Sequence, residues 1–205
     1  MFDRRLLAWQ EIALGAPARW LSARGVSADA VTLCGFAIGI AATGLIASRY
    51  YGWALVGILA NRVLDGVDGV IARGQAATDR GAFLDIALDF FFYSAVPFGF
   101  AVADPAANAL AAAALLLSFA GTGSSFLAFA VIAAKRSLSS TAFPKKGLYY
   151  LGGLTEGTET VVAFAAMCLW PAGFAMIAWG FAALALITTI MRWLWGWRRF
   201  SETKS

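Results

Sequence analysis

Two pairs of aspartates stand at helical spacing in a strongly apolar chain, in the stretch DGVDGVIARGQAATDRGAFLDIALD that covers residues 65–89. Asp65 and Asp68 are three residues apart, and Asp85 and Asp89 are four apart. On helices, each pair projects from one face. Carboxylates among lipid-facing residues lose much of their hydration and therefore indicate function. Two helices joined by a short loop could direct all four carboxylates at one point.

Four carboxylates that lie so close together cannot all remain ionised without compensating positive charge. The site would offer oxygen ligands alone, because the chain contains no histidine. Such a ligand set favours a hard divalent cation, so the sequence predicts Mg²⁺ or Mn²⁺. The carboxylates alone also allow a protein of another class, a cation-coupled membrane transporter that uses the aspartates as an ion pathway.

The composition indicates that these aspartates belong to an integral membrane protein. Of the 205 residues, 60% are hydrophobic and 14% are charged, whereas soluble domains have about 45–50% and about 25%. The mean hydropathy is +0.73. A membrane-spanning helix needs about 20 apolar residues. The sequence therefore predicts an all-α fold with six transmembrane helices, at residues 30–48, 52–72, 82–102, 108–134, 156–171 and 173–195.

Residues 1–29 are predicted to form an amphipathic helix that lies on the membrane surface. Leu14 and Trp20 are among the side chains that would face the lipid, while arginines would contact the headgroups. Residues 30–196 are predicted to form one six-helix membrane domain, and residues 197–205 a cytoplasmic tail. The sequence gives no sign of a second domain or of an internal repeat.

Basic residues alternate from one predicted connection to the next. The N-terminal region, the connections after the second and fourth helices, and the C-terminus are rich in Lys and Arg, and the other connections nearly lack them. Because basic loops stay in the cytoplasm, both termini and the aspartates are predicted to face the cytoplasm at a bacterial inner membrane. The net charge of +4 fits anionic lipid at the inner leaflet and requires no nucleic-acid partner.

The stretch around the aspartates resembles the signature of the CDP-alcohol phosphotransferase (CDP-alcohol phosphatidyltransferase) family, D-x2-D-G-x2-A-R-x8-G-x3-D-x3-D. The spacer between Arg73 and Gly81 has seven residues where the family usually has eight. The predicted six-helix topology extends the resemblance to most of the chain. The fixed positions of the signature are matched by Asp65, Asp68, Gly69, Ala72, Arg73, Gly81, Asp85 and Asp89.

The resemblance implies a reaction in which a substituted phosphate passes from a CDP-linked donor, often CDP-diacylglycerol, to an alcohol, with release of CMP. It also implies two Mg²⁺ or Mn²⁺ ions between the carboxylates and the donor pyrophosphate. Asp65, Asp68 and Asp85 would be metal ligands. Asp89 would lie beside the ions as a further ligand and serve as the general base for the acceptor hydroxyl. With the full signature present, the transporter is the weaker alternative.

The resemblance also places the CDP donor against these helices. Gly69 and Ala72 lack bulky side chains, so a nucleotide could lie against the helix backbone. Arg73 could bind phosphate through charge-assisted hydrogen bonds, and Gly81 would let phosphate approach a helix N-terminus. Thr78 would bond the nucleotide or cap that helix. The predicted donor site comprises Asp68, Gly69, Ala72, Arg73, Thr78 and Gly81.

The acceptor alcohol is marked less clearly than the donor. Lys145 and Lys146 would suit a phosphorylated acceptor such as glycerol 3-phosphate, or would simply follow the charge rule for cytoplasmic loops. Glu156 and Glu159 share a helix face. They could hold a polyol or an amine such as serine, or they could cap the helix. Beyond substrates and membrane lipids, the resemblance allows a homodimer as a partner.

Two further polar residues precede the first aspartate. Arg62 is predicted to pair with Asp65 at i+3, or to extend its head group to the membrane surface. Asn61 lies on the same helix face as Asp65, where it would touch the site or hydrogen-bond a neighbouring helix.

Overall fold

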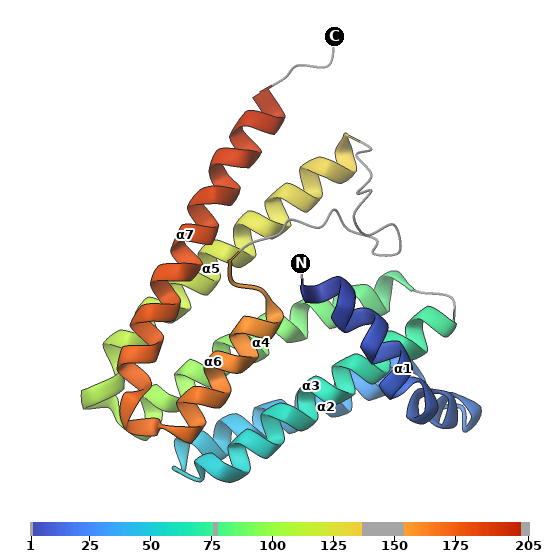
Figure 1. Ribbon diagram of the computed structural model, residues 1–205, viewed down its shortest axis with the longest axis horizontal. Coiled ribbons are helices and arrows are strands. Elements are labelled where there is room, and N and C mark those ends of the chain that lie inside the picture. Colours follow the sequence, from blue (N-terminus) through green and yellow to red (C-terminus); the bar gives the residue numbers. More distant parts are fainter. Residues whose placement is uncertain (1, 76–77, 137–153, 202–205) are drawn as a thin grey trace.

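The computed structural model describes residues 2–75, 78–136 and 154–201, and within these ranges it contains helices and no strand. Each of the six predicted transmembrane ranges overlaps one of the helices α2 to α7 (Figure 1). The prediction of an all-α fold is therefore confirmed. The elements are α1 (Phe2–Ala23), α2 (Ala28–Ala47), α3 (Tyr51–Gly74), α4 (Asp79–Ala103), α5 (Pro105–Lys135), α6 (Gly157–Leu169), the 3-10 turn η1 (Pro171–Gly173) and α7 (Phe174–Ser201).

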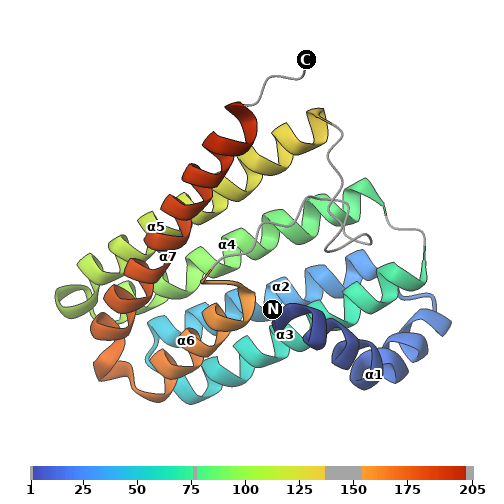
Figure 2. The same cartoon turned by 45° about the horizontal axis from the view of Figure 1, so that its top comes forward.

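The helices form two groups that diverge from a common end (Figures 1 and 2). In one group, α2 packs against both α3 and α4, and in the other α5 packs along α7. α4 also contacts α5, while α6 contacts α3 and α7, so these contacts join the two groups. α1 packs against α3 near the end where the groups are apart.

Apolar packing fills the end where the groups meet. Phe92 and Phe100 of α4, Phe164 of α6 and Phe174 of α7 are fully buried in one hydrophobic cluster. The rings of Phe100 and Phe174 stack with their centroids 4.4 Å apart. Because these residues belong to the second half of α4 and the start of α7, they fix the helices at one end. The aspartates therefore lie at the other end, where the helices leave space.

Four helices are long and apolar enough to cross a membrane, namely those at Ala28–Ala47, Asp79–Ala103, Pro105–Lys135 and Pro171–Ser201. α3 has sufficient length but carries Arg62 at its middle and Asp65 and Asp68 in its second half. α6 has 13 residues, which gives a length of about 20 Å, shorter than the roughly 30 Å hydrocarbon core. The count of six transmembrane helices therefore stays a prediction.

The N-terminal helix packs against the rest of the protein through a small cluster of its own. Ala18 of α1 is buried with Val31, Val67 and Ile71, and Leu14 packs against the same cluster. Leu14 thus contacts protein where lipid was expected, because the apolar face of α1 covers α3. Trp20 is 54% exposed, and the Arg24 guanidinium lies 3.6 Å from the centre of its ring.

The C-terminal boundary predicted between residues 196 and 197 falls inside α7, which continues to Ser201. The last turns of α7 pack against α5, since the ring centroids of Phe129 and Phe200 lie 4.7 Å apart. Arg136 donates a hydrogen bond to the Phe200 carbonyl at 2.8 Å. Residues that charge alone assigned to a tail are thus part of a packed helix.

Candidate active site

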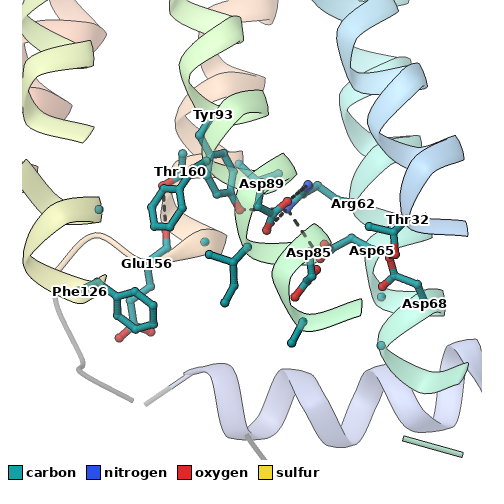
Figure 3. Close-up of a pocket in the computed structure, with 18 of the residues that line it drawn as sticks. Thr32, Arg62, Asp65, Asp68, Asp85, Asp89, Tyr93, Phe126, Glu156 and Thr160 are labelled. Carbon is teal, nitrogen blue, oxygen red and sulfur yellow. Dashed lines mark hydrogen bonds and ion pairs between the residues drawn. The ribbon is translucent and has the colours of Figure 1, made fainter. Parts of the chain in front are cut away.

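A cavity of about 1240 Å³ lies between the two groups of helices and is lined by residues of α2 to α7. Polar and charged side chains are among those that line it, and Figure 3 shows the four aspartates on one side and Glu156 and Phe126 on the other. The cavity therefore collects polar groups that the lipid-facing surfaces of these helices could not accommodate.

Three of the four aspartates meet in one tight group. Asp65, Asp68 and Asp85 each offer a carboxylate oxygen, and these oxygens all lie within 4.8 Å of one another. Asp65 and Asp68 come from α3 and Asp85 comes from the first two turns of α4, so the group joins two consecutive helices. Asp68 is buried at 5% exposure, and the Thr32 hydroxyl of α2 donates to its Oδ2 at 2.5 Å.

The group fits a divalent cation by the chemistry of its donors. All three side chains are carboxylates, and their oxygens converge from two rigid helices. Hard cations such as Mg²⁺ and Mn²⁺ prefer such oxygen ligands. Three uncompensated carboxylates at this spacing would also repel one another strongly, which a bound cation would relieve.

Asp89 is not a member of this group and contacts an arginine. Arg62 NH2 lies 2.7 Å from Asp89 Oδ1, whereas Arg62 NH1 lies 3.7 Å from Asp65 Oδ2. The predicted pairing of Arg62 with Asp65 is therefore present, but the closer partner is Asp89. The alternative in which Arg62 extends to the membrane surface is wrong, because its side chain is only 14% exposed.

A network of hydrogen bonds fixes the Arg62 guanidinium. NH1 donates to the Tyr93 hydroxyl at 2.9 Å, and Nε donates to Asn61 Oδ1 at 2.8 Å. Asn61 in turn donates to the Gly35 carbonyl of α2 at 2.8 Å. It therefore hydrogen-bonds a neighbouring helix, which is one of the two alternatives predicted for it. Sequence analysis missed Tyr93. Its position four residues after Asp89, on the same face of α4, was the signal that could have found it.

The residues predicted for the CDP donor all line the cavity. They are Asp68, Gly69, Ala72, Arg73, Thr78 and Gly81. The Thr78 hydroxyl accepts a hydrogen bond from the Gly81 amide at 3.0 Å and caps α4. Of the two roles predicted for Thr78, the structure contains the cap.

Two glycines stand where side chains would fill needed space. A Cβ at Gly81 would lie 3.1 Å from Asp29 Oδ1 and 3.2 Å from Thr78 Oγ1, so a larger residue would push these two side chains aside by a few tenths of an ångström. A Cβ at Gly69 would lie 3.2 Å from Arg73 NH1. The Asp29 carboxylate also accepts a hydrogen bond from Arg80 Nε at 2.8 Å. Asp29 and Thr32 were not predicted, although their place in the first turns of an apolar helix marked them as unusual.

The shortened spacer of the signature lies at the turn between the two aspartate-bearing helices. α3 ends at Gly74 and α4 begins at Asp79. The side chain of Gln75 donates to the Ser22 hydroxyl of α1 at 3.1 Å. α1 therefore contacts the chain where the spacer begins.

The opposite wall of the cavity is built by α5, α6 and α7. Arg192 donates through NH1 to the Thr122 carbonyl at 3.1 Å, and its guanidinium lies 5.9 Å from the centre of the Phe126 ring. Glu156 and Thr160 line the cavity from α6.

The two glutamates predicted for the acceptor form a capping box at the start of α6. The Glu156 amide donates to Glu159 Oε2 at 3.1 Å. Among the described residues, Glu156 lines the cavity and Glu159 does not. Lys145 and Lys146, the other residues predicted for the acceptor, lie outside the described residues.

The fold and the site together define an all-helical integral membrane protein with a carboxylate cluster in a central cavity. The model of the CDP-alcohol phosphatidyltransferase family matches residues 26–194. The chain therefore belongs to the CDP-alcohol phosphatidyltransferase family, and the resemblance seen in the sequence is confirmed. This membership gives no support to the transporter alternative.

Similar proteins fall into two groups. The chain is 52% identical over 192 residues to "Inner membrane protein YnjF" of Escherichia coli K12, covering 94% of this chain and 93% of that protein. Among solved structures, phosphatidylinositol phosphate synthase (PgsA1) of Mycobacterium tuberculosis with CDP-DAG bound aligns with a TM-score of 0.71 at 21% identity, over 90% of this chain and 93% of that chain. The same synthase with manganese and citrate aligns with a TM-score of 0.66 at 22% identity, over 90% and 88%. At such identities these structures establish a shared fold.

Proposed function

We propose that the protein transfers a phosphatidyl group from CDP-diacylglycerol to a small alcohol and releases CMP. The observation that carries this proposal is the meeting of Asp65, Asp68 and Asp85 from two helices beside a cavity of about 1240 Å³. Family membership supports the class of reaction. The choice of donor is supported by the mycobacterial synthase, whose structure holds CDP-DAG.

The three clustered aspartates would hold a divalent cation, Mg²⁺ or Mn²⁺. When bound, the cation supplies positive charge that offsets the carboxylates and the donor pyrophosphate and stabilises charge on the phosphoryl oxygens. The manganese-bound form of the mycobacterial synthase supports this choice of metal.

The donor would lie along the cavity-facing side of α3 and the N-terminus of α4. Gly69 and Ala72 leave the helix backbone open to a flat nucleotide, and Arg73 would bind phosphate oxygens. The N-terminus of α4, at Thr78 and Gly81, carries partial positive charge that favours phosphate. The diacyl chains would extend into the lipid around the bundle.

The transfer forms one phosphorus–oxygen bond and breaks another. The acceptor hydroxyl oxygen attacks the phosphorus that carries the diacylglycerol, and the hydroxyl proton passes to a carboxylate oxygen of Asp89. The bond from this phosphorus to the bridging oxygen of the pyrophosphate breaks, and CMP leaves with the electron pair. Arg62, 2.7 Å from Asp89, orients this carboxylate for the proton transfer.

The acceptor would enter against the wall formed by α5, α6 and α7. Glu156, Thr160 and Arg192 line the cavity there, and Figure 3 shows Glu156 on the side opposite the aspartates. A polyol, an amine such as serine, or a phosphorylated alcohol such as glycerol 3-phosphate each finds a complementary group among them.

We place the protein across a bacterial inner membrane with its cavity open to the cytoplasm. In this arrangement α2 to α7 form a six-helix membrane domain over residues 30–196, with residues 1–29 at the interface and residues 197–205 in the cytoplasm. The alternation of basic connections supports the orientation. The relation to an inner membrane protein supports the location. The charged residues of α3 line the cavity, so lipid need not contact them.

The test is to incubate the purified protein with labelled CDP-diacylglycerol, Mg²⁺ or Mn²⁺, and a panel of alcohols. We expect CMP and a phospholipid product only when lipid donor, metal and the correct alcohol are all present. Excess chelator should abolish the reaction. Movement of cations into vesicles without CMP formation would contradict the proposal and favour a transporter.

A further inference from the structure

Arg62 places a fixed positive charge where two of the four carboxylates converge. Its guanidinium lies 2.7 Å from Asp89 Oδ1 and 3.7 Å from Asp65 Oδ2. Figure 3 shows the side chain of Arg62 pointing from α3 to Asp89 on α4, beside the group formed by the other aspartates. The Arg62 guanidinium therefore links α3 and α4, the two helices that carry the aspartates, from within the site.

The position of this guanidinium is determined by contacts on several sides. Tyr93 accepts a hydrogen bond from NH1 at 2.9 Å, and Asn61 accepts one from Nε at 2.8 Å. The ring centroids of Phe92 and Tyr93 lie 5.0 and 5.2 Å from Cζ of Arg62. A side chain held on these sides and only 14% exposed cannot swing to the membrane surface without breaking the network.

We infer that Arg62 takes the place of a second divalent cation, so that the protein binds one metal ion at Asp65, Asp68 and Asp85 before substrate arrives. The inference rests on the proposed function, because it concerns the number of metal ions at the proposed active site. It gives one ion where the sequence analysis expected two. A second ion would need Asp89 and a shared carboxylate as ligands, and Arg62 already contacts Asp89 and Asp65. A guanidinium and a divalent cation at one such point would repel each other.

Counting bound metal tests this inference without any turnover. The full-length protein in detergent is titrated with Mn²⁺ in the absence of donor, whose pyrophosphate would bring ligands of its own. Electron paramagnetic resonance of the free Mn²⁺ then gives the stoichiometry. We expect one Mn²⁺ per wild-type chain and two per chain for Arg62→Gln, because the substitution removes the positive charge and frees Asp89. Two ions on the wild-type protein would overturn the inference.

The Asp89→Asn variant tests the same point and leaves Arg62 in place. If Asp89 holds Arg62 and no metal, this variant should still bind one Mn²⁺ with a Kd within about threefold of wild type, because Asn keeps the shape of the side chain. A fall in stoichiometry or a large loss of affinity would show that Asp89 is a ligand. This measurement decides the question even if Arg62→Gln does not fold.

Two control variants separate charge from packing. Arg62→Gln combined with Asp89→Asn should return to one Mn²⁺, because the second ion has lost its carboxylate. Tyr93→Phe removes a hydrogen bond of Arg62 but leaves its charge, so it should stay at one Mn²⁺. A second ion in Tyr93→Phe would mean that the network, and not the charge of Arg62, sets the count.

A parallel assay of CMP release separates this inference from the proposed function. Wild-type protein that releases CMP from CDP-diacylglycerol but binds two Mn²⁺ would overturn the inference alone. Protein that binds one Mn²⁺ but releases no CMP with any alcohol would uphold the count and overturn the proposed reaction. Protein that binds no Mn²⁺ would overturn both.

Discussion

The cavity wall formed by α3 and α4 carries its chemistry between residues 65 and 89, whereas the wall formed by α5, α6 and α7 gathers it from residues 122 to 192. On the first wall, two helices that are consecutive in the sequence bring Asp65, Asp68 and Asp85 within reach of one another. On the second wall, Thr122 belongs to α5, Arg192 belongs to α7 and Glu156 is the residue that precedes α6. Local spacing therefore defines the first wall, called the donor wall because we propose that it binds the CDP donor. Long-range packing defines the second wall, called the acceptor wall because we propose that it binds the alcohol.

The difference has a functional consequence for a transferase of this family. We propose that the donor wall provides chemistry that any CDP-linked lipid needs, namely metal ligands and a phosphate site. The acceptor wall would then distinguish one alcohol from another. Substitutions on the donor wall should therefore abolish turnover or donor binding. Substitutions on the acceptor wall should change the choice of alcohol.

The largest effect is expected at the buried aspartate of the donor wall. Asp68→Asn removes a negative ligand atom from the group of three, so metal binding and transfer should both fail. We expect kcat/KM for CMP release to fall by about a thousandfold or more. Asp104→Asn is the matched control, because Asp104 caps α5 away from the cavity and Asn caps equally well. Near-normal turnover by Asp68→Asn would exclude it as a metal ligand.

A large but more selective loss is expected at Asp89. Removing a general base typically costs about 10²–10⁴ in rate, so Asp89→Asn should lower kcat by that range. Donor affinity should stay within a few-fold of wild type, because Asp89 contacts Arg62 and is not a member of the group of three. Binding of a radiolabelled CDP donor provides the measurement. Loss of donor binding equal to that of Asp68→Asn would contradict separate roles for the two aspartates.

An intermediate effect is expected where the donor wall has no side chain. Gly69→Leu would displace the Arg73 guanidinium, whose NH1 would lie 3.2 Å from the new Cβ, and would fill volume assigned to the nucleotide. We expect the Kd for the CDP donor to rise by about tenfold or more, as one lost charge-assisted contact implies. Gly52→Leu is the control on the same helix, because open space surrounds Gly52. Unchanged donor affinity in Gly69→Leu would place the nucleotide elsewhere.

The contrast between the two walls also explains which features could be predicted from the sequence. The aspartate pairs could be predicted because helical periodicity places Asp65 beside Asp68 and Asp85 beside Asp89, and the other residues of the predicted donor site followed from the resemblance to the family signature. Apolar runs likewise located every helix from α2 to α7 to within several residues. The closer pairing of Arg62 with Asp89 could not be predicted, since it depends on how α3 and α4 are placed relative to each other.

Contacts with distant residues likewise escaped the sequence. Thr32 reaches Asp68 from another helix, and no local pattern connects the two. Residues 197–201 of the predicted tail are helical, and Phe200 packs against Phe129 on α5, a contact that charge patterning does not predict. Glu156 and Glu159 matched two predictions equally well, and only the three-dimensional arrangement shows that both belong to the capping box and that Glu156 also lines the cavity.

The smallest effect, and the one that tests the acceptor wall directly, is expected at these glutamates and at the preceding lysines. Glu156 lines the cavity, so Glu156→Gln should raise the KM for an amine or polyol acceptor about fivefold, as loss of one charged hydrogen bond implies. Glu159→Ala should mainly lower the free energy of unfolding, by about 1 kcal/mol, through loss of the capping box.

For a phosphorylated acceptor the pattern reverses. Lys145→Ala with Lys146→Ala should then raise its KM, because an anion loses its partners, and Glu156→Gln should matter little. Donor KM serves as the internal control. If the acceptor KM is unchanged in both the glutamate and the lysine variants, these glutamates only begin α6 and the lysines only follow the charge rule for cytoplasmic loops. Arg192 and its neighbours on α5 would then determine which alcohol binds.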